Sequence, residues 1–143
     1  MRIMCLDIGE KRIGVAVSDP LGITAQGLDV IQRQGLKSDL LQIRRFIDDY
    51  QVEEVILGLP LNMDGTKGEK ALEVLRMRDF LSKKISLPVK TWDERLTTVA
   101  AEKVLLEGDV SRAGRKKVID KLAATLILEN YLHYLHQRRG SED

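Results

Sequence analysis

Acidic residues at three places far apart in the sequence are the candidates for chemistry. Asp7 closes the first apolar run of the chain, and Asp93 and Glu94 close a later strand-like stretch. Asp120 lies in a long stretch with helical periodicity. Carboxylates that converge repel one another unless a hard divalent cation binds between them. If these acids meet in the fold, the sequence predicts a Mg²⁺ or Mn²⁺ site.

A carboxylate cluster of this kind is suited to hydrolysis of a phosphodiester bond. One ion can activate water near neutral pH while a second, ~4 Å away, stabilises the leaving oxygen. Of the two adjacent acids we favour Glu94 as the ligand, with Asp93 second, because neighbouring side chains alternate across a strand. Structural roles remain possible for these acids. Asp93-Glu94 followed by Arg95 is typical of a surface ion pair or of a helix start. Asp7 could cap a turn.

Asp120 heads an apolar stripe of the last predicted helix. On a helical wheel it lies within about 60 degrees of the positions Ala123, Ala124, Ile127 and Tyr131. A solvated face therefore does not explain this acid, and we expect it to point inward. A buried ion pair with Lys117, one helical turn earlier, is the structural alternative.

Basic residues that could hold a nucleic-acid backbone gather near Asp120. The densest positive run of the chain consists of Arg112, Arg115, Lys116, Lys117 and Lys121. Such a run is usually a solvated face, but cations at a helix start oppose the helix dipole, which favours a bound phosphate. Lys11, Arg12 and Arg95 are further candidates, and a helix start at Thr97-Thr98 could bind phosphate through backbone N–H groups.

The hydrophobic pattern predicts the elements that must position these acids. Apolar runs on both sides of a polar turn indicate a β-hairpin over residues 3–18, whose first strand ends on Asp7 and lies centrally because it is apolar without alternation. A third strand, at a sheet edge, is expected over 27–33. A helix from an N-cap at Ser38 to residue 50 follows. The later elements are a buried strand at 54–60, a polar loop at 61–68, a helix at 69–84, a strand at 88–92, a helix from 97 or 98 to 107 and a long helix at 115–136.

This order of elements predicts an α/β fold of the ribonuclease H-like type. We expect a mixed five-stranded sheet, built from an antiparallel hairpin meander plus parallel strands, with helices on both faces. Parallel strands end along one edge of a sheet, so Asp7 and the Asp93-Glu94 pair should meet there, and the last helix can bring Asp120 to them. The predicted domain spans residues 1–137, with a frayed tail at 138–143.

Composition narrows the class of protein. The chain of 143 residues fits one domain, and 23 basic against 22 acidic residues leave a net charge of +1, which gives no bulk attraction to nucleic acid or to membranes. The single cysteine, Cys5, lies in an apolar run and is expected to be a buried hydrophobe, so a disulfide framework is excluded. No apolar run approaches the ~20 residues of a membrane span and no signal peptide is recognisable, so we expect a cytoplasmic protein without a membrane partner.

Four ordered motifs carry a resemblance to a known family. They are Asp7-Ile8-Gly9-x-Lys11-Arg12-x-Gly14-Val15-Ala16, Gly58-Leu59-Pro60, Asp93-Glu94-Arg95-Leu96-Thr97-Thr98 and Lys117-x-x-Asp120-x-x-Ala123-Ala124. Over about residues 2–135 the sequence resembles the YqgF (RuvX-like) family, described as Holliday junction resolvases and as pre-16S ribosomal RNA nucleases.

The resemblance implies both an activity and a set of site residues. It implies a ribonuclease H-like fold, a bacterial cytoplasmic location, a divalent metal and hydrolysis of structured nucleic acid, with 5′-end processing of small-subunit rRNA as the favoured role. Asp7, Glu94 and Asp120 take the places of the family's acids. Related junction resolvases carry an acid after the fourth strand, where this chain has Gly58-Leu59-Pro60, so Asp93-Glu94 would have to substitute.

The sequence is also compatible with functions other than an rRNA nuclease. Asp7-x-Gly9 on a first hairpin also resembles the phosphate loop of actin-like and sugar-kinase phosphotransferases, but those folds need two domains. A junction resolvase acting on branched DNA and a non-catalytic RNA-binding module of the same fold remain alternatives, as do a monomer and a homodimer. His133 and His136 are expected at the surface, and Trp92 is either a half-buried strand aromatic or a base-stacking residue.

Overall fold

The computed structural model describes the backbone of residues 1–96 and 112–142 and the side chains of residues 1–95 and 121–138. The strands are β1 (Ile3–Ile8), β2 (Arg12–Ser18), β3 (Ala25–Gln32), β4 (Glu54–Leu59) and β5 (Val89–Asp93). The helices are α1 (Leu36–Tyr50), α2 (Glu69–Lys84), a 3₁₀ turn η1 (Glu94–Leu96) and α4 (Arg112–Glu142). The helix predicted from residue 97 or 98 to 107 lies outside the described residues. None of the described helices combines the length and apolar character needed to cross a membrane.

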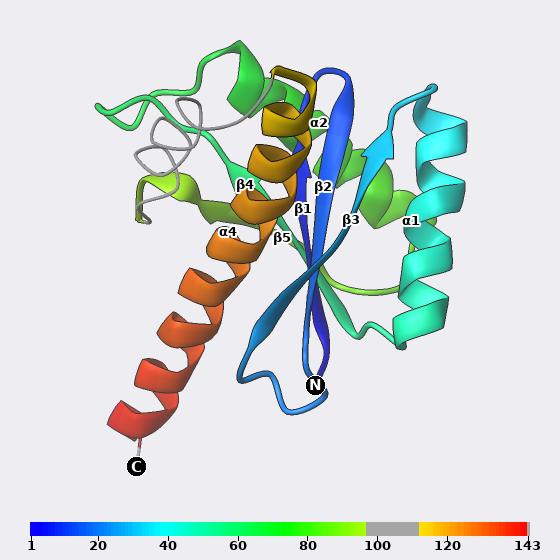
Figure 1. The fold of residues 1–143 in the computed structure, drawn as a ribbon. Coiled ribbons are helices and arrows are strands. Elements are labelled where there is room, and N and C mark those ends of the chain that lie inside the picture. Colours follow the sequence, from blue (N-terminus) through cyan, green and yellow to red (C-terminus); the bar gives the residue numbers. More distant parts are fainter. Residues whose placement is uncertain (97–111, 143) are drawn as a thin grey trace.

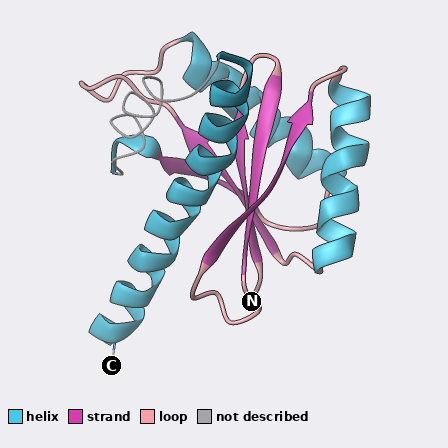
Figure 2. Ribbon diagram, in the orientation of Figure 1, coloured by secondary structure: helices cyan, strands magenta, loops and turns pink. Residues whose placement is uncertain are grey.

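The five strands form one mixed sheet in the order β3-β2-β1-β4-β5 (Figures 1 and 2). β1 is central, pairs antiparallel with β2 and parallel with β4, and β4 pairs parallel with β5. The predicted hairpin meander, the edge position of β3 and the parallel strands are therefore confirmed. β1, β4 and β5 all end at the same edge of the sheet, with β4 lying between the other two.

Each face of the sheet is covered by a separate hydrophobic core. On one face, Ile3 and Cys5 of β1 pack with Ile127 of α4. On the other, Met4 and Leu6 belong to the cluster that α1 and α2 complete. Figure 1 shows α4 crossing one face while α1 and α2 cover the other. Because side chains alternate along a strand, this division places the next odd-numbered position of β1 on the α4 side.

Two helix boundaries differ from those the sequence predicts. α1 begins at Leu36 rather than after Ser38, because Gly35 takes the N-cap position with φ 110°, a left-handed value that favours glycine. α4 begins at Arg112 and continues past His136, into the tail that we expected to fray. Gln137, Arg138 and Arg139 are good helix formers and no proline follows His136, so the helix continues there.

Several residues that could be mistaken for ligands have structural roles. Cys5 is fully buried, as predicted for a small hydrophobe. His133 and His136 are exposed, and His136 Nε2 lies 3.0 Å from the carbonyl oxygen of Gly22. Trp92 is half-buried on β5, so the strand-aromatic interpretation fits this side chain.

A polar network fastens α4 to β4 and β5. The Tyr131 hydroxyl donates to Glu54 Oε2 over 3.2 Å, and Lys90 Nζ forms an ion pair with Glu54 Oε1 at 2.5 Å. Trp92 Nε1 donates to Asn130 Oδ1 over 3.0 Å, and its ring meets that of Tyr131 edge to face. Glu54 is 4% exposed, so its charge depends on these two partners.

This network predicts a pH dependence of stability. Burial, followed by the charge of Glu54, raises the pKa of Tyr131 from 10.0 to about 12. The folded state thus favours the protonated phenol, and this contribution is present below pH 10 and lost as pH rises through about 12. In urea titrations, the free energy of unfolding of the wild type should fall relative to Tyr131→Phe across that interval. A difference between the two proteins that does not change with pH would contradict the assignment.

Candidate metal centre

Asp7 is the first acid of the predicted cluster, and β1 positions it. It lies one residue before the end of the central strand and pairs with Gly14 of β2. Ile3 and Cys5, at the preceding odd positions, both lie in the α4-side core. Asp7 is therefore presented at the carboxyl edge of the sheet on the side that α4 covers.

Glu94 is the second acid, and its side chain lies over β4 on the face of the sheet that α4 covers. It is the first residue of η1, directly after β5, and is half-buried. A Cβ atom built on Gly58 of β4 would lie 2.5 Å from Glu94 Oε1 and 2.7 Å from Ile127 Cδ1. Only glycine leaves room for this approach. The resemblance led us to expect that related resolvases carry an acid at the end of the fourth strand. In this chain Gly58 lies there, and the Glu94 carboxylate occupies the space over it.

Asp7 and Glu94 line one cavity of about 360 Å³ at the strand ends. Glu10 of the hairpin turn and Glu69 and Glu73 of α2 line it too, and Lys70 is the one cation that the described side chains contribute. The charges of both acids also reach a buried thiol. Burial, followed by the negative charges of Asp7 and Glu94, raises the pKa of Cys5 well above its usual value. Both carboxylates therefore act on the same buried atom.

Asp93 does not share this cavity. Arg95 forms an ion pair with it at 2.8 Å (Nη2 to Oδ2), and hydrogen bonds from the Arg95 side chain, then from its backbone N–H, lower the pKa of Asp93. Arg95 Nη1 also donates to the carbonyl oxygen of Met63 over 3.3 Å, which ties the loop at 61–68 to the end of β5. For Asp93 and Arg95 the surface ion pair anticipated above is the arrangement found, and of the two adjacent acids only Glu94 turns to the site.

The remaining sequence-predicted site residues divide into two groups. Lys11 and Arg12 belong to the hairpin turn and the start of β2, and neither lines the cavity. The structure does not describe the side chains at the start of α4. The predicted site residues among them are Asp120, Arg112, Arg115, Lys116 and Lys117. The backbone of α4 begins at the end of the sheet where β1 and β4 finish (Figure 1). Thr97 and Thr98 are also outside the described residues.

Of the three acids favoured as metal ligands, the structure describes the side chains of two, Asp7 and Glu94. Among the side chains that the structure describes, no set of three or more His, Cys, Asp and Glu residues is arranged to hold a metal ion. Asp7 and Glu94 nevertheless offer oxygen ligands to one cavity, which is the donor type that Mg²⁺ and Mn²⁺ prefer. A third ligand would come from the start of α4, where the sequence places Asp120.

The turn next to Asp7 is held by a pair that sequence analysis did not single out. Arg33 Nη1 donates to the carbonyl oxygen of Gly9 over 2.9 Å, and Arg33 Nε donates to Asp39 Oδ2 over 3.0 Å. Asp39 is 1% exposed, so this ion pair anchors the turn to a buried side chain in the first turn of α1. The sequence shows Arg33 before the predicted helix and Asp39 near its start. This local pattern does not predict that Arg33 also contacts Gly9, which lies in a distant turn.

Comparison with solved structures gives the class of fold. The chain is similar to Thermus thermophilus RuvC in complex with Holliday junction substrate, with a TM-score of 0.57 and 15% identity over 94% of this chain and 96% of that one. It is also similar to the fowlpox virus Holliday junction resolvase, with a TM-score of 0.50 and 17% identity over 96% and 99% of the two chains. The fold is therefore that of the RuvC-like, ribonuclease H-type resolvases.

Sequence relatives narrow the class to a family. The model of the RuvX family, described as Holliday junction resolvase, matches residues 1–134. A Desulforamulus reducens protein is 56% identical over 132 residues, 92% of this chain and 96% of its own length. A Halothermothrix orenii protein is 56% identical over 140 residues, 98% of this chain and 100% of its own length. Both carry the name "Putative pre-16S rRNA nuclease". The chain belongs to the RuvX family.

Gly58→Ala tests whether the space over β4 is essential. The new methyl group would collide with Glu94 and Ile127, so we expect a loss of about 1–3 kcal/mol of stability from overpacking. Displacement of Glu94 should also weaken Mn²⁺ binding measured by calorimetry. Gly68→Ala is the matched control, because its nearest neighbour, Asn62 Oδ1, is 3.5 Å from the added atom. Equal stability and equal Mn²⁺ affinity of the two variants would refute the role given to Gly58.

Proposed function

We propose that this protein is a metal-dependent nuclease that hydrolyses phosphodiester bonds in structured nucleic acid and processes the 5′ end of the small-subunit rRNA precursor. The observation that carries the proposal is the convergence of Asp7 and Glu94, from the ends of β1 and η1, in one cavity above Gly58. Membership of the RuvX family and the shared name of relatives 56% identical to this chain support the rRNA substrate.

The acids that we assign to catalysis and metal binding are Asp7, Glu94 and Asp120. A bound Mg²⁺ or Mn²⁺ would supply the Lewis-acid chemistry, activating water and stabilising the charge of the leaving oxygen. Asp7 is held on a strand buried on both faces, and Glu94 is held against Gly58 and Ile127, so both carboxylates are oriented before a ligand arrives.

The charge of the cavity makes a cation necessary for this function. Acids line it from β1, the hairpin turn, α2 and η1, and Lys70 is the one cation among the lining residues that the structure describes. A phosphodiester entering this cavity alone would be repelled, because like charges at short range disfavour one another. A divalent cation held by Asp7 and Glu94 would neutralise those two carboxylates and offer a positive centre to the phosphate.

Basic residues beside the cavity would hold the nucleic-acid backbone. We assign this role to Lys11, Arg12, Arg112, Arg115, Lys116 and Lys117. Arg95, which the sequence suggested for the same role, is engaged with Asp93 and contributes by fixing the loop at 61–68. Because the net charge is only +1, attraction depends on this local group and should weaken with salt. Processing of an rRNA precursor implies a cytoplasmic protein, acting as a monomer or a homodimer.

Cleavage of branched DNA is the second candidate function. The RuvX family model is described as Holliday junction resolvase, and the fold is that of RuvC. Both functions use the same acids, so they differ in substrate rather than in chemistry. A direct comparison of an rRNA-precursor 5′ fragment with a four-way DNA junction, under identical Mg²⁺ and salt, separates them.

Substitution of the two convergent acids tests the catalytic assignment. Asp7→Asn and Glu94→Gln should each lower Mg²⁺-dependent cleavage by more than about 100-fold, since loss of a mere hydrogen-bond partner of a metal ligand costs roughly 10- to 100-fold. Substrate binding and the circular dichroism spectrum should be retained. Asp93→Asn is the matched control, because a surface ion pair is worth only about 0–1 kcal/mol, and it should keep most of the activity.

Two outcomes would overturn the proposal. Cleavage that persists in Asp7→Asn would remove the central acid from the mechanism. Salt-sensitive RNA binding without metal-dependent cleavage of either substrate would identify a binding module with the same fold. In cells, depletion should lead to accumulation of 5′-extended small-subunit rRNA, and normal 5′ ends after depletion would exclude the processing role.

A further inference from the structure

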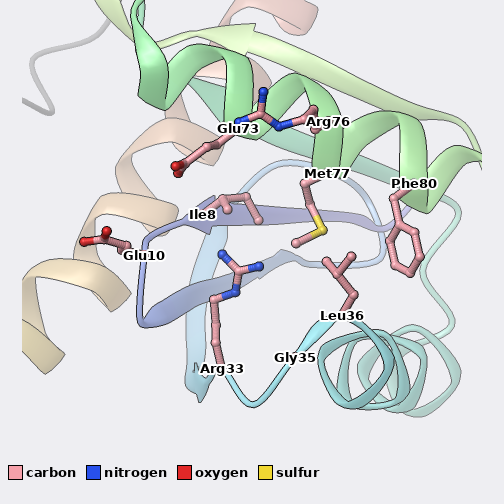
Figure 3. Close-up of a pocket in the computed structure, with 9 residues that line it drawn as sticks. All are labelled: Ile8, Glu10, Arg33, Gly35, Leu36, Glu73, Arg76, Met77 and Phe80. Atoms are coloured by element: carbon pink, nitrogen blue, oxygen red, sulfur yellow. The ribbon is translucent and has the colours of Figure 1, made fainter.

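A second cavity, of about 510 Å³, adjoins the acidic one on the α1 and α2 side of the sheet edge (Figure 3). Ile8, Glu10 and Glu73 line both cavities. The two cavities are therefore neighbours around the end of the β1–β2 hairpin. A chain bound at Asp7 and Glu94 can extend into the second cavity without leaving the protein surface.

The second cavity combines apolar and cationic walls. Met77 and Phe80 of α2 and Leu36 of α1 form the apolar side, and Leu36 is 48% exposed although it is a large hydrophobic residue. Arg33 and Arg76 enter from opposite sides, one from the end of β3 and the other from α2 (Figure 3). Neither an apolar ligand nor a simple anion would use both kinds of wall.

The two arginines differ in how far they are already engaged. Arg33 uses Nε for Asp39 and Nη1 for Gly9, which leaves its Nη2 group outside both bonds. For Arg76, the described part of the chain provides neither an ion pair nor a hydrogen bond. Arg76 is therefore the residue with a guanidinium to offer to a ligand.

We propose that this cavity binds one unpaired nucleotide of the RNA strand whose neighbouring phosphate lies at the acidic cavity. The base would lie against Phe80 and Met77, and its phosphate would pair with Arg76. Glu10 and Glu73, on the shared border, repel phosphate, so the sugar and base rather than the phosphate would cross there. The inference rests on the proposed nuclease function and adds to it a requirement for a single-stranded nucleotide beside the cleaved bond.

Methionine methyl groups give a readout that does not depend on cleavage. Of the four methionines, Met77 lines the cavity with 4% of its surface exposed, whereas Met4 is fully buried in the sheet and serves as an internal reference. With ¹³C-methyl methionine labelling of Asp7→Asn protein in Mg²⁺, which should bind RNA without cleaving it, a short single-stranded RNA should shift the Met77 resonance and leave Met4 unchanged. The same RNA in a perfect duplex should leave both unchanged, because its bases are paired.

Variants on one helix separate the subsite from general electrostatics. Arg76→Ala should reduce the slope of log affinity against log salt by ~1 and diminish the Met77 shift, as expected for loss of one phosphate contact. Arg78→Ala is the matched control, since Arg78 pairs with Asp79 and does not line the cavity. Phe80→Leu keeps the apolar bulk but removes the aromatic face, and should weaken single-strand binding by about fivefold or more.

The result separates this inference from the nuclease function itself. The proposed subsite would be refuted if the Met77 resonance does not shift when single-stranded RNA binds, or if it shifts equally with the duplex. Either result would refute the subsite even if Asp7-dependent cleavage is observed. Absence of any RNA binding would overturn it as well. A Met77 shift that Arg76→Ala abolishes and Arg78→Ala preserves supports the subsite, and it does so even if no cleavage is detected.

Discussion

Two carboxylates that share one cavity repel each other, and the arrangement of the surrounding elements depends on holding them there. Asp7 lies on β1 and Glu94 directly follows β5, on the other side of β4, and the charges of both act on the buried thiol of Cys5. Their charges would separate if the chain were free to relax. The central strand, buried on both faces, prevents this for Asp7, and packing over Gly58 prevents it for Glu94. On the function proposed above, a site built in this way would favour a hard cation over a neutral ligand.

Neighbouring elements keep the cavity in shape. Arg33 and the buried Asp39 connect the turn after β1 to the start of α1, so movement of that turn would require breaking a largely buried ion pair. Such a break is costly because it leaves a charge without a partner. On the other side, Arg95 joins the end of β5 to the loop before α2. Both arginines therefore act on the site through the backbone, which local sequence patterns do not reveal.

The sequence predicted the order of elements well because hydrophobic periodicity is a local property. β4 and α2 appear at nearly the predicted positions, and Ala123, Ala124, Ile127 and Tyr131 of the predicted inward stripe are all buried. The sequence favoured Glu94 over Asp93 by strand alternation, and Glu94 is the acid that lines the cavity, although it lies in η1 directly after β5. The role of Gly58 was not predictable, because the space it leaves is used by a residue of another strand. The start of α1 was misplaced because Gly35 and the buried Asp39, rather than Ser38, define it.

Crystals soaked in Mn²⁺ would test the convergence of the acids most directly. The anomalous signal locates the ion without any assumption about substrate or activity. We expect a peak within coordination distance of carboxylate oxygens of both Asp7 and Glu94, and its loss in Asp7→Asn crystals. A peak bound only by Glu10, Glu69 or Glu73, or no peak in the cavity at a saturating Mn²⁺ concentration, would contradict the metal centre described above.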